Sequence, residues 1–490
     1  MQIKQAVFSR PSRYVDVAIV GAGFSGSMVA IHLAHTLRGV FQIALIEKGR
    51  RAGPGIAYST ENPLHLLNVP VVRMGAYPER PRHFYEWLKE HPALVARYNL
   101  DPLTEGDFVP RRLYGLYLEL LVQRLALQSG RVHRFEQEAV DLTEAPDRSF
   151  RLCLGDKTVI SAKKVVLALG NFPPGDPVVP DQRFHRSGNY ISDPWRKSTL
   201  KRLSEAADIL ILGSGLTALD LILSLSEMKH SGTIYVLSRR GLFPQRHAAV
   251  QPYVFHLSDP RKIRRVRCLL RAVRNEVSFA EGMNIGWRSV IDALRPHTQV
   301  IWQQLDLDER RRFFRHLRPY WECHRHRAAP AALDIKEAME KTGRLRCCQG
   351  RVERIFEEEN ALRVNFRDRS QISRTLAVSP VVNCTGPECN YHKLRDPLIL
   401  QLFFRGLARP DPLFIGFDVS DTGQLFDATG RVVPNLYTLG SPQKGRLLET
   451  TAVPELRQQA LELATRLSED LQRETRRALE ELPVGHSFEI

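Results

Sequence analysis

The stretch Val15-Asp-Val-Ala-Ile-Val-Gly-Ala-Gly-Phe-Ser-Gly26 decides the fold of the first part of the chain. Its first six residues are an apolar run rich in β-branched residues, which predicts a buried strand. Glycines then follow with the spacing G-x-G-x-x-G, and a helix is predicted over 27–37. Gly21 permits the tight turn, Gly23 lets a pyrophosphate approach the backbone, and Gly26 lets the helix pack closely on the strand. The free N–H groups at the helix N-terminus would face the phosphates.

An acidic residue follows at the distance that a nucleotide ribose requires. A second strand is predicted over 41–46, and the next residue, Glu47, lies 21 positions beyond Gly26. A carboxylate about 20 residues after the third glycine can accept hydrogen bonds from the ribose hydroxyls. The alternative is an ordinary glycine turn, which would not by itself place a strand, a helix, a second strand and an acid in this order.

A second turn of the same kind occurs near the middle of the chain. A strand predicted over 207–212 leads into Gly213-Ser-Gly-Leu-Thr-Ala218, and a helix is predicted over 219–228. The next strand, predicted over 233–237, is followed by the basic pair Arg239 and Arg240 instead of an acid.

The charge after this second strand predicts the nucleotide. Arg239 stands at the offset that Glu47 has in the first turn. An acid there would repel a ribose 2′-phosphate, whereas a guanidinium can bind it with two hydrogen bonds. We therefore expect NADPH rather than NADH at the second turn. The alternative is that Arg239 and Arg240 are solvated residues at a strand end.

Composition limits the class of protein. The 490 residues are 43% hydrophobic and 25% charged, which is typical of a globular protein and excludes a disordered or collagen-like chain. No apolar run approaches the length of about 18 residues that a membrane span needs, and the N-terminus lacks the apolar core of a secretory signal. Seven scattered cysteines favour a reducing cytoplasm. Cys384 and Cys389 are interpreted as packing residues, because Cys384 ends an apolar run, with a redox pair as the alternative; the chain has no C-x-x-C dithiol.

Positive charge is concentrated in one segment. The formal net charge is +16, and 20 basic against 10 acidic residues lie between Arg261 and Arg346. We predict a basic helical insert at about 260–345. It is either a clamp for an anionic substrate or the NADPH phosphate, or a helical surface paired with local acids. Nucleic-acid binding is not expected, since no recognition motif accompanies the charge. Cys323, His324 and His326 are not expected to form a zinc site.

Further motifs carry a resemblance over most of the chain. They are Gly53-Pro-Gly-Ile-Ala-Tyr58, His65-Leu-Leu-Asn68, Phe84-Tyr-Glu-Trp87, Val165-Val-Leu-Ala-Leu-Gly170, Ser238-Arg-Arg-Gly-Leu-Phe-Pro244 with His247, Arg318-Pro-Tyr-Trp321 and Glu449-Thr-Thr-Ala-Val-Pro-Glu455. With the two glycine turns, the chain resembles flavoproteins with two dinucleotide-binding domains. In particular it resembles the bacterial FAD-NAD(P)-binding protein family, which is distantly similar to lysine and ornithine N-hydroxylases.

The resemblance implies an α/β fold with two Rossmann-like domains, one for FAD and one for NAD(P)H, and a helical insert. The expected division is an FAD-binding domain over 1–200, an NAD(P)H-binding domain over 201–387, and a return to the FAD-binding domain over 388–490. A helix is expected to begin near Pro454, with its N-terminus toward the flavin. The wider superfamily holds the FAD ribitol with an acid where this chain has Ser441.

Motifs and resemblance together give the candidate site residues. Catalytic roles beside the flavin are expected for His65, Asn68 and Arg73, with His65 as a proton shuttle. The FAD-binding residues are Gly21, Gly23, Ser25, Gly26, Glu47, Lys48, Asn68, Met74, Gly170, Gly440, Thr450, Thr451 and Ala452. The NADPH-binding residues are Gly213, Gly215, Thr217, Ala218, Arg239 and Arg240. No metal ligand is predicted. The alternative for His65, Asn68 and Arg73 is a polar residue that bonds to local backbone in a long loop.

Three functions are compatible with this pattern. The first is an NADPH-using flavin monooxygenase that forms a C4a-hydroperoxyflavin with O2 and oxygenates an anionic or amine-bearing small molecule. The second is an NADPH-dependent FAD reductase or dehydrogenase without oxygen insertion, and the third is a dinucleotide-binding protein without catalysis. The F-x-G-x-x-x-H fingerprint of Baeyer–Villiger enzymes is absent around 170–195.

Overall fold

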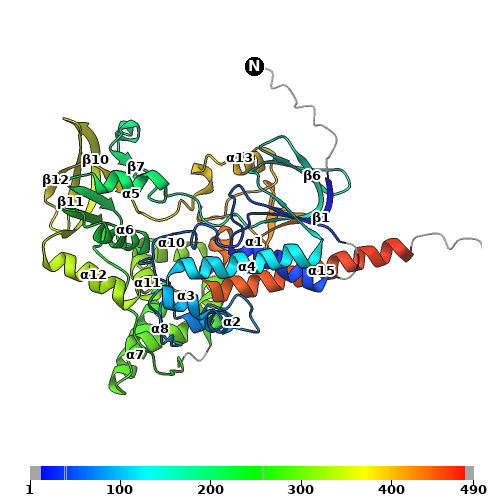
Figure 1. Cartoon of the computed structure of the whole chain (residues 1–490), viewed down its shortest axis with the longest axis horizontal. Helices are drawn as coiled ribbons and strands as arrows, with labels where there is room; N and C mark the ends of the chain where they lie inside the picture. Colours follow the sequence, from blue (N-terminus) through cyan, green and yellow to red (C-terminus); the bar gives the residue numbers. More distant parts are fainter. Residues whose placement is uncertain (1–12, 38, 40, 257–258, 481–490) are drawn as a thin grey trace, which may run out of the picture.

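The computed structural model describes residues 13–37, 39, 41–256 and 259–480, which form two sheets and their helices (Figure 1). The eight-stranded first sheet has the order β14-β15-β6-β1-β2-β3, with β4 and β5 attached to β6. Its strands are β1 (Arg13–Val20), β2 (Ile43–Ile46), β3 (Val132–Phe135), β4 (Ala139–Glu144), β5 (Phe150–Leu154), β6 (Val159–Leu167), β14 (Gln424–Phe426) and β15 (Val432–Thr438).

The alternation of β1 distributes its side chains between two cores. Val17 and Ile19 pack beneath α1, α4 and α15, whereas Ala18 and Val20 face the layer of β4, β5 and α13. Figure 1 shows α1, α4 and α15 along one side of this sheet. The helices of this part are α1 (Phe24–Thr36), α2 (His83–Lys89), α3 (Pro92–Arg97), α4 (Arg111–Ser129), α13 (Pro397–Phe404), α14 (Lys444–Leu447), α15 (Val453–Glu480) and the 3-10 turns η1 (Val71–Arg73), η5 (Tyr391–Lys393) and η6 (Ser441–Gln443). The turn η2 (Arg183–Arg186) packs against the second sheet instead.

The seven-stranded second sheet has the order β12-β11-β10-β9-β8-β13-β7. Its strands are β7 (Tyr190–Ile191), β8 (Ile209–Leu212), β9 (Ile234–Ser238), β10 (Leu345–Glu358), β11 (Ala361–Asp368), β12 (Ser373–Val378) and β13 (Val381–Asn383). The neighbours from β10 to β7 are parallel, and β10 to β12 form an antiparallel meander. The expected architecture of two α/β sheet units is confirmed.

Two crossover segments connect the sheets and lie beside each other. The first follows β6 and the second follows β13. They meet where Pro174 bridges Pro387 and Glu388 N–H donates to Pro173 O at 3.0 Å. The chain enters the second sheet at β7, before the boundary of 200/201 expected from the sequence, which would cut α5 (Lys197–Ser204). We propose that the second unit runs from β7 to β13.

The basic segment is a helical insert between β9 and β10, as expected. After the turn η3 (Pro260–Lys262) it contains α7 (Val266–Gly282), α8 (Trp287–Leu294), η4 (Arg295–His297), α9 (Thr298–Gln304), α10 (Leu307–His316), α11 (Arg318–Arg325) and α12 (Pro330–Lys341); α6 (Leu216–Glu227) precedes β9. The backbone is extended at Ile263 and Arg265, so α7 begins only after them. In the described ranges, no helix combines the length and apolar character that a membrane crossing needs.

Candidate functional site

The first glycine turn packs closely against backbone atoms at Gly21 and Gly26. Gly21 has φ +98°, and its N–H donates to Ile46 O at 2.8 Å. A Cβ at Gly21 would lie 2.2 Å from Ala168 O, and a Cβ at Gly26 would lie 1.9 Å from Gly21 O. Both distances are far shorter than a van der Waals contact, so side chains are excluded at both positions. The helix predicted from residue 27 begins earlier, because α1 starts directly after Gly23.

A second glycine segment lies over this turn and leaves its backbone uncovered by side chains. Gly53 N–H donates to Ala22 O at 2.7 Å, and a Cβ at Gly23 would meet Gly55 Cα at 3.4 Å. At the end of β6, a Cβ on Gly170 would meet nothing within 4 Å. A nucleotide phosphate approaching the turn therefore meets backbone N–H groups and open space, which fits the dinucleotide expected there.

Glu47 is held at the carboxyl end of β2. Its Oε2 accepts from Ala22 N–H at 2.8 Å and its Oε1 from Gly49 N–H at 3.1 Å. The carboxylate thus lies beside the glycine turn, at the position expected for a ribose ligand. Lys48, by contrast, is exposed and pairs with Glu138 at 3.5 Å. The FAD-binding role of Lys48 stays a prediction.

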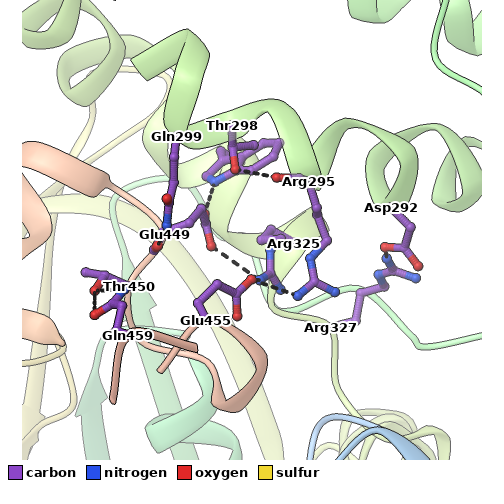
Figure 2. Close-up of polar contacts among 11 residues, drawn as sticks. Asp292, Arg295, Thr298, Gln299, Arg325, Arg327, Glu449, Thr450, Glu455 and Gln459 are labelled. Atoms are coloured by element: carbon purple, nitrogen blue, oxygen red, sulfur yellow. Dashed lines mark hydrogen bonds and ion pairs between the residues drawn. The ribbon is translucent and has the colours of Figure 1, made fainter. Parts of the chain in front are cut away.

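The C-terminal part of the chain completes the surroundings of the first turn. Gly440, with φ +76°, donates its N–H to Gln459 Oε1 at 3.1 Å and accepts from Thr450 Oγ1 at 3.1 Å. A Cβ at Gly440 would lie 3.5 Å from Ser25 Oγ, so the segment after β15 reaches the first turn of α1. Figure 2 shows Thr450 beside Gln459.

The residues next to this contact differ in exposure. Thr450 is buried, Ala452 is half-buried and Thr451 is exposed. α15 begins at Val453, which confirms the helix expected near Pro454. Ser441, in place of the acid of the wider superfamily, donates its hydroxyl to Asn171 Oδ1 at 2.8 Å. This serine therefore links β15 to the segment that follows β6.

The second glycine turn repeats the first with more open space. Gly213 has φ +103°, and its Cβ would lie 2.3 Å from Cys384 O. Ala218 is fully buried, so this turn accommodates a methyl group where the first requires glycine. Gly215 is exposed and a Cβ there would meet nothing within 4 Å, while Thr217 is half-buried beside it.

The two arginines that follow β9 differ in their contacts. Arg239 is exposed and makes no hydrogen bond or ion pair with any described residue. Arg240 Nη1 donates to the Tyr320 hydroxyl at 3.2 Å, and its Cζ lies 5.1 Å from the centroid of that ring. Since Tyr320 belongs to α11, the insert reaches the second glycine site with one side chain.

His65 lies at a contact between the two sheet units. Its Nε2 is 2.9 Å from Ser224 Oγ and 3.0 Å from Asp220 O, both on α6, and its Nδ1 is 2.7 Å from Thr60 Oγ1. Burial lowers the pKa of His65, and nearby Arg111 adds to this effect, although Asp220 opposes it. Because both ring nitrogens already have partners, the structure offers no free nitrogen for the proton shuttle expected from the sequence.

The other expected catalytic residues lie further along the same segment. Asn68 is half-buried and Arg73, in η1, is exposed, and neither has a hydrogen-bond partner among the described residues. Met74 is buried in the core beneath α1 and α4. The roles of all three stay predictions, and Arg73 is the one whose charge is free to bind a ligand.

The insert is attached to the C-terminal segment by buried ion pairs (Figure 2). Arg325 Nη2 lies 3.3 Å from Glu449 Oε2 and 3.1 Å from Glu455 Oε1, and Arg295 also pairs with Glu455, at 3.0 Å. Trp321 Nε1 donates to Glu449 Oε1 at 2.7 Å. Burial alone would raise the pKa of Glu449, but Arg325 and the other cationic neighbours hold it below its usual value.

This arrangement combines parts of both expectations for the basic segment. The cations of α11 are paired with acids, as in the second alternative, but the pairs involving Arg325 and Arg327 are buried and not on a helical surface. Their partners include Glu449 and Glu455, which flank Thr450. The insert therefore fixes the segment that reaches the first glycine turn.

Residues 18–172 match the sequence model of a family described as FAD-NAD(P)-binding. The match covers less than half of the chain, and over these residues it agrees with the resemblance inferred from the sequence. A search of curated protein sequences gives no significant match.

Solved structures with a similar fold align with nearly the whole chain. L-lysine 6-monooxygenase from Pseudomonas syringae aligns over 93% of this chain and 99% of its own, with a TM-score of 0.63 and 16% identity. Ornithine hydroxylase from Pseudomonas aeruginosa aligns over 94% and 100%, with a TM-score of 0.62 and 16% identity. FAD-bound cadaverine monooxygenase from Erwinia amylovora aligns over 93% and 95%, with a TM-score of 0.58 and 12% identity. At such identities the similarity establishes the fold.

Proposed function

We propose that this protein is an FAD-dependent, NADPH-using flavin monooxygenase that acts on a small molecule. The observation that carries the proposal is the unequal enclosure of two dinucleotide turns in one chain. The first is covered by Gly53–Gly55 and by Gly440 with Thr450, whereas Gly215 of the second is exposed. A resident FAD suits the enclosed turn and an exchanging NADPH suits the open one.

Different residues of the chain would bind FAD and NADPH. Glu47 holds the ribose of FAD, and the backbone around Gly23 holds its pyrophosphate. Arg239 binds the 2′-phosphate of NADPH, because its guanidinium is exposed and has no protein partner. FAD, when bound, supplies the chemistry of accepting a hydride and activating O2.

Oxygen insertion is favoured over a disulfide reductase activity by the cysteines. Cys384 is buried, and burial raises the pKa of its thiol well above its usual value, so it is a poor thiolate. Cys389 Sγ instead contacts Pro387 O. The solved structures with similar folds that are named above are monooxygenases of small amines. These points support a small molecule that bears an anionic or an amine group as substrate, and the seven free cysteines support a location in the cytoplasm.

The experiment is to supply the FAD-loaded protein with NADPH, labelled oxygen gas and a panel of small amines and carboxylates. A monooxygenase incorporates one labelled oxygen into a product, and the amount of product rises with the NADPH consumed. Release of all the oxygen as hydrogen peroxide with every compound favours the second candidate, an NADPH-dependent reductase. Failure of NADPH to bleach the flavin without oxygen excludes both enzymes and leaves a non-catalytic dinucleotide-binding protein.

A further inference from the structure

The loop after β9 brings a histidine against the end of the insert. His247 N–H donates to Ala328 O at 2.9 Å, and Ala328 N–H donates to Gln245 O at 2.9 Å. This short ladder sets His247 beside Arg327. The imidazole ring packs on Phe108, with 4.9 Å between the ring centroids, and its nitrogens have no hydrogen-bond partner among the described residues.

Two guanidinium groups from the insert share one aromatic neighbour next to this histidine. Arg288 Cζ lies 4.5 Å and Arg327 Cζ lies 5.8 Å from the centroid of Trp287. Arg288 Nε donates to the carbonyl of Arg246, the residue before His247, at 2.9 Å. Both guanidiniums are therefore held close to His247 by independent contacts.

The charge of Arg327 is only partly satisfied. Its Nη2 pairs with Asp292, as Figure 2 shows, and its Nε donates to His324 O at 3.2 Å. Its Nη1 is buried without a hydrogen-bond partner, although the residue is only 4% exposed. A buried N–H without an acceptor is unfavourable, so this group favours a ligand that accepts a hydrogen bond.

A third guanidinium approaches from the FAD-binding part of the chain. Burial and the charges of Arg327, Arg73 and Arg288 lower the pKa of His247 to about 4, with Asp292 opposing them. Val71 N–H donates to Asp107 O at 2.9 Å, and the next residue, Phe108, packs on His247, so η1 with Arg73 lies beside the segment that contacts this histidine. It is exposed and unpaired, and two residues later Gly75 O accepts from Arg457 of α15 at 2.8 Å.

The balance of charge at this place is positive. The guanidinium groups of Arg73, Arg288 and Arg327 all disfavour a charged His247, and the opposing acid, Asp292, is paired with Arg327. Like charges that meet in a partly buried space repel one another unless a counter-ion joins them. A carboxylate or phosphate supplies both the negative charge and the acceptor oxygens that planar guanidiniums bind in pairs.

We propose that Arg73, Arg288 and Arg327 form a binding site, between the FAD-binding part and the insert, for an oxyanion of the small-molecule substrate. The substrate class is therefore a small organic carboxylate or phosphate. That the bound anion belongs to the substrate rests on the proposed function, whereas the binding site itself rests on the contacts described above. Phe108 and Trp287 supply apolar surface beside the charged groups.

The test uses the oxidised, FAD-loaded protein and three probes of equal chain length: pentanoate, pentyl phosphate and pentylamine. Calorimetric titration gives the affinity of each probe. We expect pentanoate or pentyl phosphate to bind and pentylamine not to bind. Preference between the two anions identifies the source of the oxyanion, and preferential binding of pentylamine overturns the proposal.

Variants locate the site. Arg73→Gln is expected to weaken binding of the preferred anion by about tenfold or more, as the loss of a charge-assisted hydrogen bond implies. Arg73→Lys keeps the charge and should retain part of the affinity, and Arg288→Met should resemble Arg73→Gln. Arg267→Gln, at an exposed and unpaired arginine of α7, is the matched control and should bind like the wild type.

Equal losses in Arg73→Gln and Arg267→Gln would overturn the proposal, because the anion would then respond to overall charge alone. Unchanged binding in both Arg73→Gln and Arg288→Met would also overturn it. Flavin absorbance reports folding of each variant. Because the titration needs no NADPH, its result is independent of whether NADPH reduces the flavin, which tests the proposed function separately.

Discussion

The two glycine turns of this molecule have the same backbone but different surroundings. The first requires glycine at its third position, is covered by Gly53–Gly55, and is followed by Glu47, whose carboxylate accepts two backbone N–H groups. The second accommodates Ala218, is open at Gly215 and is followed by the unpaired Arg239.

This difference indicates that the same local motif can serve both a retained and an exchanging nucleotide. The turn itself provides the phosphate-binding N–H groups in both cases. Enclosure by distant segments determines how readily a nucleotide leaves, and the charge after the second strand determines which ribose is accepted. The following changes test each part of the comparison.

The largest effect on stability and FAD retention is expected at the third position of the first turn, Gly26. Gly26→Ala places a Cβ 1.9 Å from Gly21 O, where only backbone could move. We expect it to cost more than about 2 kcal/mol in the free energy of unfolding and to abolish FAD retention. The matched change Ala218→Gly should cost only about 1 kcal/mol. Denaturant unfolding and flavin absorbance measure both, and a stable yellow Gly26→Ala protein would contradict the packing argument.

A crossed pair of substitutions separates the two nucleotides. Gly23→Val covers the enclosed turn and should weaken FAD binding by at least about tenfold, while Gly215→Val should weaken NADPH binding by a similar factor and leave FAD in place. Nothing but Gly55 lies near the new Cβ in the first case and nothing at all in the second, so both variants should fold. Loss of FAD from Gly215→Val would refute the assignment of the turns.

Charge after the second strand is tested by Arg239→Ala. The KM for NADPH should rise by about tenfold or more, as loss of a charge-assisted hydrogen bond implies, and the KM for NADH should stay the same. Tyr320→Phe removes the hydroxyl that accepts from Arg240 and should have a smaller effect. Equal changes for the two coenzymes in Arg239→Ala would place the 2′-phosphate elsewhere.

The smallest effect concerns pH. The pKa of His247 is lowered from 6.5 to about 4 in the folded protein. Between these values the unfolded chain binds the proton more strongly, so the native state loses stability as the pH falls through this window. His247→Gln should lessen the fall in Tm between about pH 7.5 and pH 5 by about 1–2 °C. His316→Gln, at an exposed histidine, is the control; an equal change there would contradict the assignment.

Local pattern was sufficient for much of the fold and part of the site. Apolar runs followed by glycine predicted β1 and β8, and spacing alone placed Glu47 at the end of β2 and Arg239 directly after β9. The start of α15 followed from Pro454. Each of these features depends on residues that are neighbours in the sequence, where periodicity and backbone geometry decide the structure.

Contacts between distant segments could not be predicted in this way. The hydroxyl partner of His65 Nε2 is Ser224, and the acids that pair with Arg325 are Glu449 and Glu455. Nothing in the local pattern identifies such partners, because they meet only when two sheets and an insert pack together. For that reason the sequence left open both the role of His65 and the choice between a clamp and a paired helical surface for the basic segment.

The most direct test of the account is to purify the protein, measure its FAD content, and mix it with NADPH or NADH in the absence of oxygen. We predict that the protein carries FAD, that NADPH bleaches the flavin absorbance, and that NADH does so more slowly. A colourless protein that does not take up added FAD, or a flavin that neither coenzyme reduces, would contradict the account.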